Sequence, residues 1–392
     1  MGMSQSHTTK TRAIELFCGI GGFRLACDSL DIRTIWANDI NPLSCAVYAD
    51  VFGVRELHEG DIRALHNSIP AHDLLTAGFP CQPFSSAGKK LGTRDPRGTL
   101  FQEIVKVIKR HIPSHFVLEN VKRLLSMENG DHFATILSAL TELDYFVEWR
   151  LLNATHFGLA QNRERVVIVG TRIQRIEQAS VTLAPLGDLD SVLRHDAWTL
   201  RSFQSWESLD HHKKKFPSWG ICYKNRCYSC DLELFSESTP KPYLADFMEA
   251  SPDETFFMDA TTNERLTQSV FVNRMLAGVR ILFNQNGGAR MGYTVFGIDG
   301  VAPTLTASHS RHYERYKVDD RFRRLTNKEY ARLQGFPDDH CRIASSFDQY
   351  GLFGNAVPPP LARWAVHRVV NAKGHSLEAL QSPINSQMVL FA

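Results

Sequence analysis

From residue 13 to residue 171, short apolar runs alternate with amphipathic stretches. The runs that favour strands are Ala13–Phe17, Thr34–Asn38, Asp73–Ala77, Phe116–Glu119 and Val166–Gly170. Segments between them, such as Leu100–His111 and Phe133–Leu143, repeat apolar residues at spacings of three and four, as amphipathic helices do. Strands separated by helices form βαβ units, so this part is predicted to be an α/β domain: a doubly wound, mostly parallel sheet with helices on both faces.

The alternation stops after Arg172, where short irregular runs and turn residues begin. A helical pattern returns at Asn327–Gln334 and Pro359–Val370, which suggests that the chain goes back to the first domain. We therefore expect a flexible N-terminus over 1–10, the first domain over 11–172, a smaller irregular β-rich domain over 173–322, a segment over 323–372 that completes the first domain, and a tail over 373–392.

Composition excludes several classes of protein. The chain is 43% hydrophobic and 22% charged, and it has no run of about 18 apolar residues, so neither a disordered chain nor a membrane span is expected. The net charge of +2 identifies no partner by itself. The N-terminus lacks the apolar stretch of a secretory signal, and eight cysteines without a regular framework fit a reducing cytoplasm.

Three of these cysteines, Cys222, Cys227 and Cys230, have a C-x4-C-x2-C spacing, with His211 and His212 nearby. Such a set could bind zinc. The segment fits better as a hairpin that turns at residues 224–225, because its side chains would then alternate between two faces. We therefore expect no metal site.

A glycine-rich loop follows the first predicted strand. Gly19, Gly21 and Gly22 permit a tight turn and a close approach of backbone to a ligand. Asp39 ends the second strand 20 residues after Gly19, where an acid can accept hydrogen bonds from ribose hydroxyls. Position 24 is Arg rather than a third fingerprint glycine, which weakens a nicotinamide interpretation; a purely structural glycine turn with a capping Asp stays open here.

Reactive side chains follow three later strands. Cys81 comes after Pro80 at the end of the fourth strand, Glu119 lies at the end of the fifth, and Arg163 and Arg165 precede the run at 166–169. Open α/β sheets bind ligands at the carboxyl ends of their strands. A nucleophile, an acid and a guanidinium are thus predicted to converge on one cleft, although each alone has an ordinary structural explanation.

The blocks that carry these residues resemble the cytosine-C5 DNA methyltransferases of bacterial restriction-modification systems, from about Arg12 to Val370. They are FCGIGGF (17–23), GFPCQPFSSAG (78–88), DPRGTLF (95–101), LENV (118–121), QNRER (161–165), RLTNKEYARLQGFP (324–337) and FGNAVPPPLA (353–362). The resemblance implies a class I, Rossmann-like, S-adenosylmethionine-dependent methyltransferase domain with an inserted target-recognition domain. Departures are small: Asp39 stands where Glu is commoner, and Cys18 where a small residue is usual.

The resemblance assigns Cys81 as the nucleophile that adds to C6 of a flipped-out cytosine. The chemistry agrees, because C5 becomes nucleophilic once a thiolate has added at C6. Glu119 would supply a proton at N3 if burial raised its pKa. Arg165 would hold the cytosine carbonyl, and Arg163 would support the site or a phosphate. The base that removes the C5 proton is not identified by the sequence.

The cofactor implied by the resemblance is S-adenosylmethionine, with Phe17 against the adenine, Asp39 on the ribose and Asn355 closing over the pocket. The full set of expected cofactor residues is Phe17, Gly19, Ile20, Gly21, Asp39, Ile40, Asp61, Ile62, Pro80, Leu100 and Asn355.

Double-stranded DNA is the implied partner, and base flipping is required because C6 is inaccessible inside a duplex. The loop after Cys81 would close over DNA, and a basic stretch together with a Thr-Leu pair would contact it in the second domain. The expected DNA-binding residues are Ser85, Ser86, Lys89, Lys90, Arg94, Arg97, Thr304, Leu305, Arg311 and His312. We expect a cytoplasmic monomer that protects short DNA motifs from a partner restriction endonuclease.

Two alternatives remain from the sequence. The tRNA branch of the same family usually carries Cys-Phe-Thr in its recognition region, and that tripeptide is absent here. A catalytically inactive DNA-binding homologue would not need Cys81, Glu119 and Arg165 together. A nicotinamide dehydrogenase is excluded by the PCQ, ENV and RER blocks.

Overall fold

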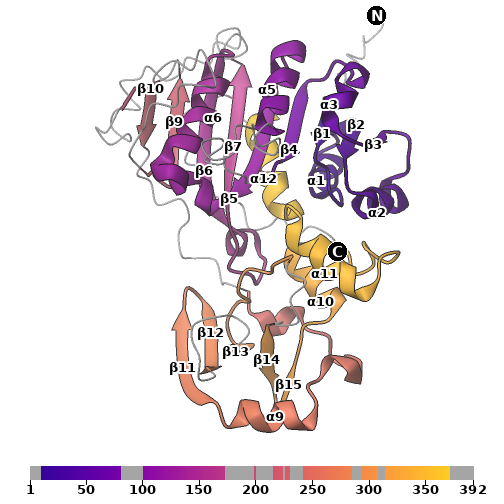
Figure 1. Cartoon of the computed structure of the whole chain (residues 1–392), viewed down its shortest axis with the longest axis vertical. Coiled ribbons are helices and arrows are strands. Elements are labelled where there is room, and N and C mark those ends of the chain that lie inside the picture. Colours follow the sequence, from indigo (N-terminus) through magenta and orange to yellow (C-terminus); the bar gives the residue numbers. More distant parts are fainter. Residues whose placement is uncertain are drawn as a thin grey trace, which may run out of the picture.

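The computed structural model describes residues 10–80, 100–172, 198–199, 215–223, 226–229, 242–284, 294–307 and 314–370. Within them, ten strands form one sheet in the order β3-β2-β1-β4-β5-β7-β6-β9-β10-β8 (Figure 1). The strands are β1 (Arg12–Leu16), β2 (Arg33–Asp39), β3 (Leu57–Glu59), β4 (Leu74–Gly78), β5 (His115–Val121), β6 (Tyr145–Asn153), β7 (Glu164–Arg172), β8 (Trp198–Thr199), β9 (Trp219–Tyr223) and β10 (Arg226–Ser229).

The strands from β3 to β5 are parallel, as the alternation of apolar and amphipathic segments predicted. The chain moves from β1 outward to β2 and β3, then returns to place β4 on the other side of β1. The order therefore reverses between β1 and β4, and a crevice opens at such a switch point beyond the carboxyl ends of the strands. Leu16 and Gly78 end these two strands, so the glycine-rich loop and the segment that leads to Cys81 start side by side.

The other half of the sheet is antiparallel, beginning where β7 pairs with β5. The sheet is therefore mixed. Strands β8 to β10 also belong to it, although the sequence assigned residues 173–322 to the second domain. The sequence pattern did not reveal that β9 pairs with β6, because the two strands are far apart in the sequence.

Helices cover both faces of this sheet. One face packs against α5 (Leu100–His111) and α6 (Asp131–Thr141), and the other against α1 (Gly22–Ser29) and α12 (Pro359–Val370). The remaining helices are α2 (Pro42–Phe52), α3 (Ile62–Leu65), α9 (Ala260–Thr267), α10 (Asn327–Gln334) and α11 (Ser346–Asn355), and 3-10 helices span His66–Ser68, Lys122–Gly130, Ala154–Phe157, Leu244–Phe247 and Glu254–Phe256. The apolar stripe of α12, including Leu361 and Val366, meets Phe23 of α1 in one cluster.

A second sheet has the order β11-β12-β13-β14-β15. Its strands are β11 (Val270–Leu276), β12 (Val279–Asn284), β13 (Thr294–Phe296), β14 (Arg315–Val318) and β15 (Arg321–Arg323). Helices α10 and α11 lie between this sheet and the first one (Figure 1). One apolar cluster joins the two regions, since it contains Ile20 of the glycine-rich loop, Phe353 of α11 and Phe296 of the second sheet.

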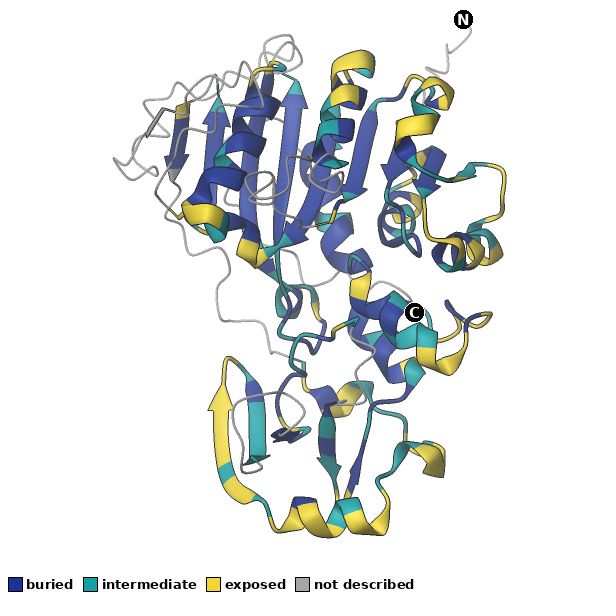
Figure 2. Ribbon diagram, in the orientation of Figure 1, coloured by how far each residue is buried: buried dark blue, intermediate teal, exposed yellow. Residues whose placement is uncertain are grey.

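Burial differs between the two sheets (Figure 2). The central strands of the first sheet are buried along most of their length, whereas the edge strand β11 is mostly exposed. The first sheet therefore supplies the rigid framework on which side chains at the strand ends are held.

The hairpin expected around residues 224–225 is present as β9 and β10, which pair Cys222 with Cys227. Their Cα atoms lie 4.1 Å apart, and the structure joins the two residues by a disulfide. The sequence analysis treated both as thiols in a reducing cytoplasm, and neighbouring cross-strand positions explain the difference because they bring the two sulfur atoms together. Cys230 lies outside the described residues.

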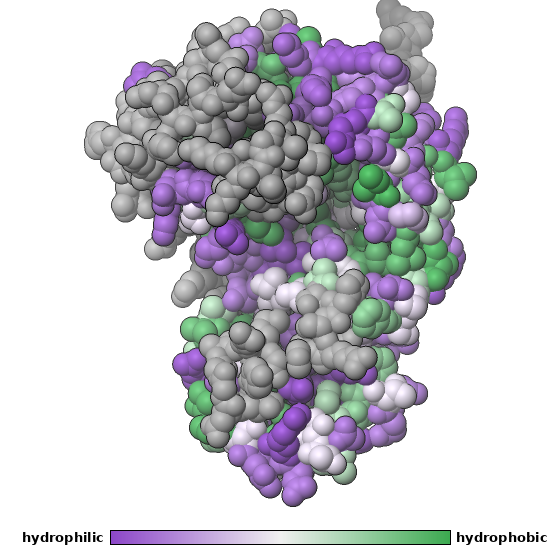
Figure 3. Space-filling view, in the orientation of Figure 1, coloured by the Kyte–Doolittle hydropathy of each residue, from purple (hydrophilic) through white to green (hydrophobic). Residues whose placement is uncertain are grey.

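Among the described residues, none of the helices has the length and apolar character needed to cross a membrane. The visible surface is largely hydrophilic, with an apolar area on the side where α2 and α11 lie (Figure 3). Exposed apolar residues in and beside these helices include Ile40, Val51, Val54, Ile343 and Phe347.

Candidate active site

The loop after β1 makes a tight left-handed turn. Phe17, Gly19 and Gly21 all have positive φ, at 55°, 53° and 87°. A side chain at Gly21 would be strained, and its Cβ would also come within 2.3 Å of the Phe52 ring. The turn ends as α1 begins at Gly22, so backbone groups of the loop face the crevice beyond β1.

Asp39 fixes this loop from the end of β2. Its carboxylate accepts hydrogen bonds from the backbone N–H of Gly19 at 2.8 Å and of Asn41 at 2.8 Å. Each carboxylate oxygen has further lone pairs, so these two bonds leave acceptor capacity for a ligand hydroxyl. Asp39 thus joins the glycine-rich loop to the start of α2.

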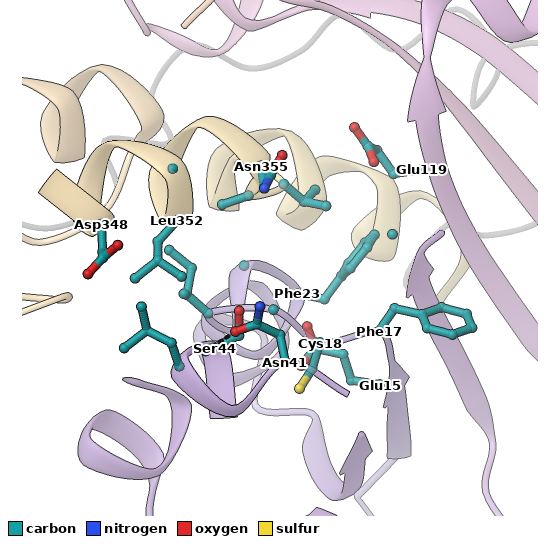
Figure 4. A pocket seen from close by; sticks show the side chains of 18 residues that line it. Glu15, Phe17, Cys18, Phe23, Asn41, Ser44, Glu119, Asp348, Leu352 and Asn355 are labelled. Atoms are coloured by element: carbon teal, nitrogen blue, oxygen red, sulfur yellow. Dashed lines mark hydrogen bonds between the residues drawn. The ribbon is translucent and has the colours of Figure 1, made fainter. Parts of the chain in front are cut away.

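A cavity of about 260 Å³ lies against this loop (Figure 4). Its walls come from the loop, the first turn of α2, and α11 with the residues after it. The lining residues are Glu15, Phe17, Cys18, Gly19, Ile20, Gly22, Phe23, Asn41, Leu43, Ser44, Gly78, Glu119, Asp348, Gly351, Leu352, Asn355, Ala356 and Val357. Elements from both ends of the chain therefore build one chamber, which we call the loop cavity.

Glu15 is a lining residue that the sequence analysis missed. It is buried, and its Oε2 atom has no hydrogen-bond partner among the described residues. Burial raises the pKa of this carboxyl to about 8, while Arg24 and the backbone N–H of Phe23 act in the opposite direction. The sequence does show it, as an acid between apolar residues one position before the strand ends.

The expected cofactor residues divide into two groups. Phe17, Gly19, Ile20 and Asn355 line the loop cavity. Gly21, Asp39, Ile40, Asp61, Ile62, Pro80 and Leu100 do not line it.

The structure places four residues of the second group away from the lining of the loop cavity. Ile40 is 64% exposed, whereas Ile62 is buried in the apolar cluster beneath the sheet. Asp61 caps α3 and pairs with Arg63, and Leu100 begins α5.

A second cavity of about 400 Å³ adjoins the first. It is lined by Gly78, Phe79, Pro80, Glu119, Asn120, Val121, Arg163, Arg165, Gly354 and Asn355. Gly78, Glu119 and Asn355 line both chambers, so a group in one chamber can approach a group in the other at Glu119. We call this chamber the acid cavity.

Glu119 and Arg165 form an ion pair in the acid cavity, with 2.9 Å between Arg165 Nε and Glu119 Oε1. They come from the antiparallel neighbours β5 and β7, whose register places Val121 opposite Arg165. Burial raises the pKa of Glu119 despite the opposing charges of Arg165 and Arg163, and burial lowers the pKa of Arg165. A carboxyl in such a site can hold a proton and donate it to a ligand.

Asn120 connects this pair to the segment that precedes Cys81. Its Nδ2 donates to the Phe79 carbonyl at 2.9 Å, and its Oδ1 accepts from the Val121 N–H at 2.8 Å. The end of β4 is thereby fixed beside the end of β5. Asn120 belongs to the LENV block, and the sequence pattern indicated no role for it.

Arg163 occupies a different environment from Arg165. It is 1% exposed, and burial together with the nearby Arg165 lowers its pKa to about 9. Its guanidinium donates to three backbone carbonyls, those of Leu305, Gly354 and Ala356. The three acceptors are all parts of this chain, and the buried Nε of Arg163 has no hydrogen-bond partner among the described residues. The residue also borders the acid cavity.

The expected DNA-binding residues lie mostly outside the described residues. This applies to Ser85, Ser86, Lys89, Lys90, Arg94, Arg97, Arg311 and His312, and to the expected nucleophile Cys81. Thr304 and Leu305 are described. The Thr304 hydroxyl donates to the Asn162 carbonyl at 2.6 Å, and Leu305 is 1% exposed, which favours a role for Leu305 inside the protein.

Comparison with known proteins decides the family. A sequence model of the C-5 cytosine-specific DNA methylases matches residues 11–371. The chain belongs to this family. It is accordingly a DNA (cytosine-5-)-methyltransferase, and the resemblance drawn from the sequence blocks is confirmed.

Curated relatives include the Type II methyltransferase M.NgoBI of Neisseria gonorrhoeae, which is 45% identical over 355 residues and is matched over 89% of this chain and 90% of its own length. M1.ScrFI of Lactococcus lactis subsp. cremoris is 32% identical, with 90% of this chain and 76% of the relative covered. M.HhaI of Haemophilus parahaemolyticus is 30% identical, with 89% and 91% covered.

Solved structures of other methyltransferases share the fold. A variant of Spodoptera frugiperda DNMT2 aligns with a TM-score of 0.60 at 17% identity, covering 92% of this chain and 99% of its own. The S. pombe Dnmt2 methyltransferase aligns with a TM-score of 0.58 at 17% identity, covering 91% and 97%. These likenesses confirm the predicted class I methyltransferase fold.

Proposed function

We propose that this chain transfers a methyl group from S-adenosylmethionine to C5 of a flipped-out cytosine in a short duplex DNA motif, through a covalent bond between Cys81 and C6. The observation that carries the proposal is the wall shared by the two cavities, in which Glu119 faces both. The methyl donor in one cavity and the cytosine in the other could then meet beside a carboxyl that holds a proton.

The loop cavity fits the cofactor chemically. The buried Oε2 of Glu15 has no hydrogen-bond partner among the described residues, and the cofactor carries an α-ammonium group that can donate to a carboxyl oxygen. Phe17, Gly19, Ile20 and Asn355 would hold it in this cavity. Asp39 stays a prediction for the ribose, and further cofactor contacts stay predicted at Gly21, Ile40, Asp61, Ile62, Pro80 and Leu100. When bound, the cofactor supplies a sulfonium methyl group as the electrophile.

The acid cavity would receive the cytosine. Pro80 lines it and directly precedes Cys81 in the sequence, so we expect the thiol to reach the edge of this cavity. The Cys81 thiolate would form a bond to C6, while Glu119 gives its proton to N3. The electron pair that leaves the C5–C6 double bond then makes C5 nucleophilic. After methylation, a base removes the C5 proton, the C6–S bond breaks to return the thiolate, and N3 gives its proton back to Glu119.

Arg165 has two tasks in this scheme. It pairs with Glu119, which orients the carboxyl, and it would donate to the cytosine carbonyl to stabilise charge that develops on the ring. Its place at the start of β7 makes it rigid, because β7 pairs along its length with both β5 and β6.

DNA would lie against the acid cavity, between the two sheets. The cytosine must leave the stack to reach the cavity, at a cost of a few kcal/mol. The segment 81–99, with its serines, lysines and arginines, is predicted to close over the duplex, and residues around 311–312 to contact it. We also propose that the product protects DNA from a partner restriction endonuclease, since the named relatives are Type II methyltransferases.

Expression in a methylation-deficient bacterial host, followed by bisulfite sequencing of genomic DNA and tRNA, tests this function. We expect one cytosine within a fixed short DNA motif to resist conversion, and Cys81→Ala to remove that protection. Protection confined to tRNA would instead assign the chain to the RNA branch of the family. No protection in either nucleic acid would contradict the proposal.

A further inference from the structure

Three consecutive residues bind the segment Thr304–Leu305. The Gln161 side chain accepts from the Leu305 N–H at 3.0 Å, and the Asn162 carbonyl accepts from the Thr304 hydroxyl at 2.6 Å. Arg163 completes the set, because its Nη1 donates to the Leu305 carbonyl at 2.9 Å. Residues 161–163 thus hold a segment that follows the second sheet's β13 and precedes β14.

The same guanidinium holds the backbone on both sides of Asn355. Nη2 of Arg163 donates to the Gly354 carbonyl at 2.9 Å and to the Ala356 carbonyl at 3.0 Å. Asn355 lines both cavities, so Arg163 fixes the part of the shared wall that α11 contributes (Figure 4). A substitution at Arg163 would therefore displace Asn355 in the wall of the loop cavity, although Arg163 does not line that cavity itself.

A second series of hydrogen bonds also holds the backbone next to Asn355. The Gln161 Nε2 donates to the Gln334 side chain at 3.3 Å, and Gln334 Nε2 donates to the Phe353 carbonyl at 2.6 Å. The backbone between Phe353 and Ala356 is thus held from two directions. Both glutamines are fully buried, so these bonds are not weakened by competition with water.

Close packing joins the two held segments directly. A Cβ atom on Gly354 would lie 2.5 Å from the carbonyl carbon and oxygen of Thr306. Glycine is therefore required at this contact, and movement of residues 304–306 would displace Gly354 and its neighbour Asn355.

We propose that Arg163 is a positioning residue: it holds Asn355 in the wall of the cofactor cavity and, with the same guanidinium, holds the Leu305 segment of the recognition region. It would then act on methyl transfer through these two segments, and not by touching a phosphate or the cytosine. A lysine could not replace it, because a single ammonium on a flexible stem lacks the planar fork that reaches Leu305 and the residues around Asn355 together. The inference rests on the proposed function, since it assigns the cofactor to the loop cavity.

The test measures binding of S-adenosylhomocysteine by calorimetry in the absence of DNA. We expect Arg163→Lys to weaken this binding by about tenfold, because Asn355 is no longer held. Arg368→Lys is the matched control: Arg368 is also a buried arginine and lies in the C-terminal segment that contains Asn355, but it pairs with Glu148. Arg368→Lys should bind S-adenosylhomocysteine within twofold of the unmodified protein. Thermal melts report whether each variant is folded.

A second readout separates positioning from phosphate contact. If Arg163 neutralised a phosphate, Arg163→Gln would reduce the slope of log Kd for duplex DNA against log salt by about 0.9. We expect the slope to stay unchanged. A reduced slope would overturn the inference. It would also be overturned if Arg163→Lys bound S-adenosylhomocysteine within twofold of the unmodified protein.

Two further outcomes are distinguishable. If Arg163→Lys does not fold, Arg163→Gln takes its place in the calorimetric test; binding of S-adenosylhomocysteine weakened severalfold would support the inference, and binding within twofold of the unmodified protein would overturn it. If the unmodified protein binds no S-adenosylhomocysteine, the proposed function fails and the inference fails with it.

Discussion

In the proposed mechanism, Glu119 is the residue on which the chemistry depends most. Its carboxyl is buried beside Arg165, and the effect of burial on its pKa exceeds the effect of the two neighbouring arginines. The protonated form is therefore favoured at a higher pH than for an exposed glutamate. The protonated form can donate to N3 of cytosine, and the ionised form cannot.

Replacing Glu119 with Gln should slow single-turnover methyl transfer by roughly 10²–10⁴-fold, the usual contribution of a general acid. DNA binding should change only a few fold. Because the proton is lost as pH rises through the raised pKa, the advantage of the unmodified protein over Glu119→Gln should shrink with increasing pH. A ratio of rates that stays constant with pH, or rates near those of the unmodified protein, would remove Glu119 as the N3 partner.

Glu15 should make stability depend on pH. Its pKa in the folded protein is about 8, above its ordinary value of 4.5, so its contribution is complete below about pH 4.5 and is lost as pH rises toward 8. Relative to the unmodified protein, Glu15→Gln should therefore gain roughly 1.4 kcal/mol of unfolding free energy for each pH unit between about 5 and 8. Urea unfolding at several pH values measures this difference, and a difference that does not change with pH would contradict it.

At the scale of elements, the neighbouring ends of β4 and β5 matter most for the site. The bond from Asn120 to the Phe79 carbonyl holds the backbone two residues before Cys81 in the sequence. A shift of about 1 Å at reacting groups can cost 10²-fold in rate. We expect Asn120→Ala to slow methyl transfer at least tenfold.

Asn67→Ala is the control for this prediction, because Asn67 is exposed and bonds to Arg110 away from the cavities. Single-turnover rates for both variants test the claim. Equal rates for Asn120→Ala and the unmodified protein would show that this bond does not position the nucleophile.

Much of the fold followed from the sequence because its central strands are continuous apolar runs. The run at 116–119 lies within β5, and the helix expected at Leu100–His111 has those bounds as α5. Strand β6 was missed since it contains Glu148 and Arg150, which are charged yet buried because they pair with each other. A pattern of single residues does not show such pairing, and it did not place β8 to β10 in the first sheet.

The site was predictable to a similar extent. Strand ends in a doubly wound sheet meet at one edge, so Glu119 and Arg165 could be placed together. Their pairing at 2.9 Å agrees with that expectation. The sequence could not show that Arg163 points into the protein, since its three partners are backbone carbonyls from distant parts of the chain. Every residue has a backbone carbonyl, so a sequence does not show which carbonyls will accept hydrogen bonds from a distant side chain.

At the scale of the whole molecule, one buried network ties the C-terminal helix to the first sheet. Glu148 of β6 accepts from Arg150, from Arg368 of α12 and from the Trp219 side chain of β9. Arg150 also lies over the Trp219 ring, 4.4 Å from its centroid. The network joins elements that are more than 200 residues apart in sequence, and it keeps α12 against the sheet.

Removing Glu148 leaves two buried guanidinium groups without their carboxylate. We expect Glu148→Ala to lower the free energy of unfolding by about 3–5 kcal/mol. Glu264→Ala, at an exposed position in α9, should change it by no more than about 0.5 kcal/mol. Urea titrations compare the two variants, and equal effects would contradict the importance of the network.

The central claim is that Cys81 bonds to a cytosine held beside Glu119, and covalent trapping tests it most directly. A duplex that carries 5-fluorocytosine at the methylated position cannot lose its C5 substituent as a proton, so the C6–S bond should persist. With S-adenosylmethionine present, we predict a complex that survives denaturation and maps by mass spectrometry to the peptide containing Cys81, and no complex with Cys81→Ala. A complex at another residue, or none with a protein that methylates the unmodified duplex, would contradict the account.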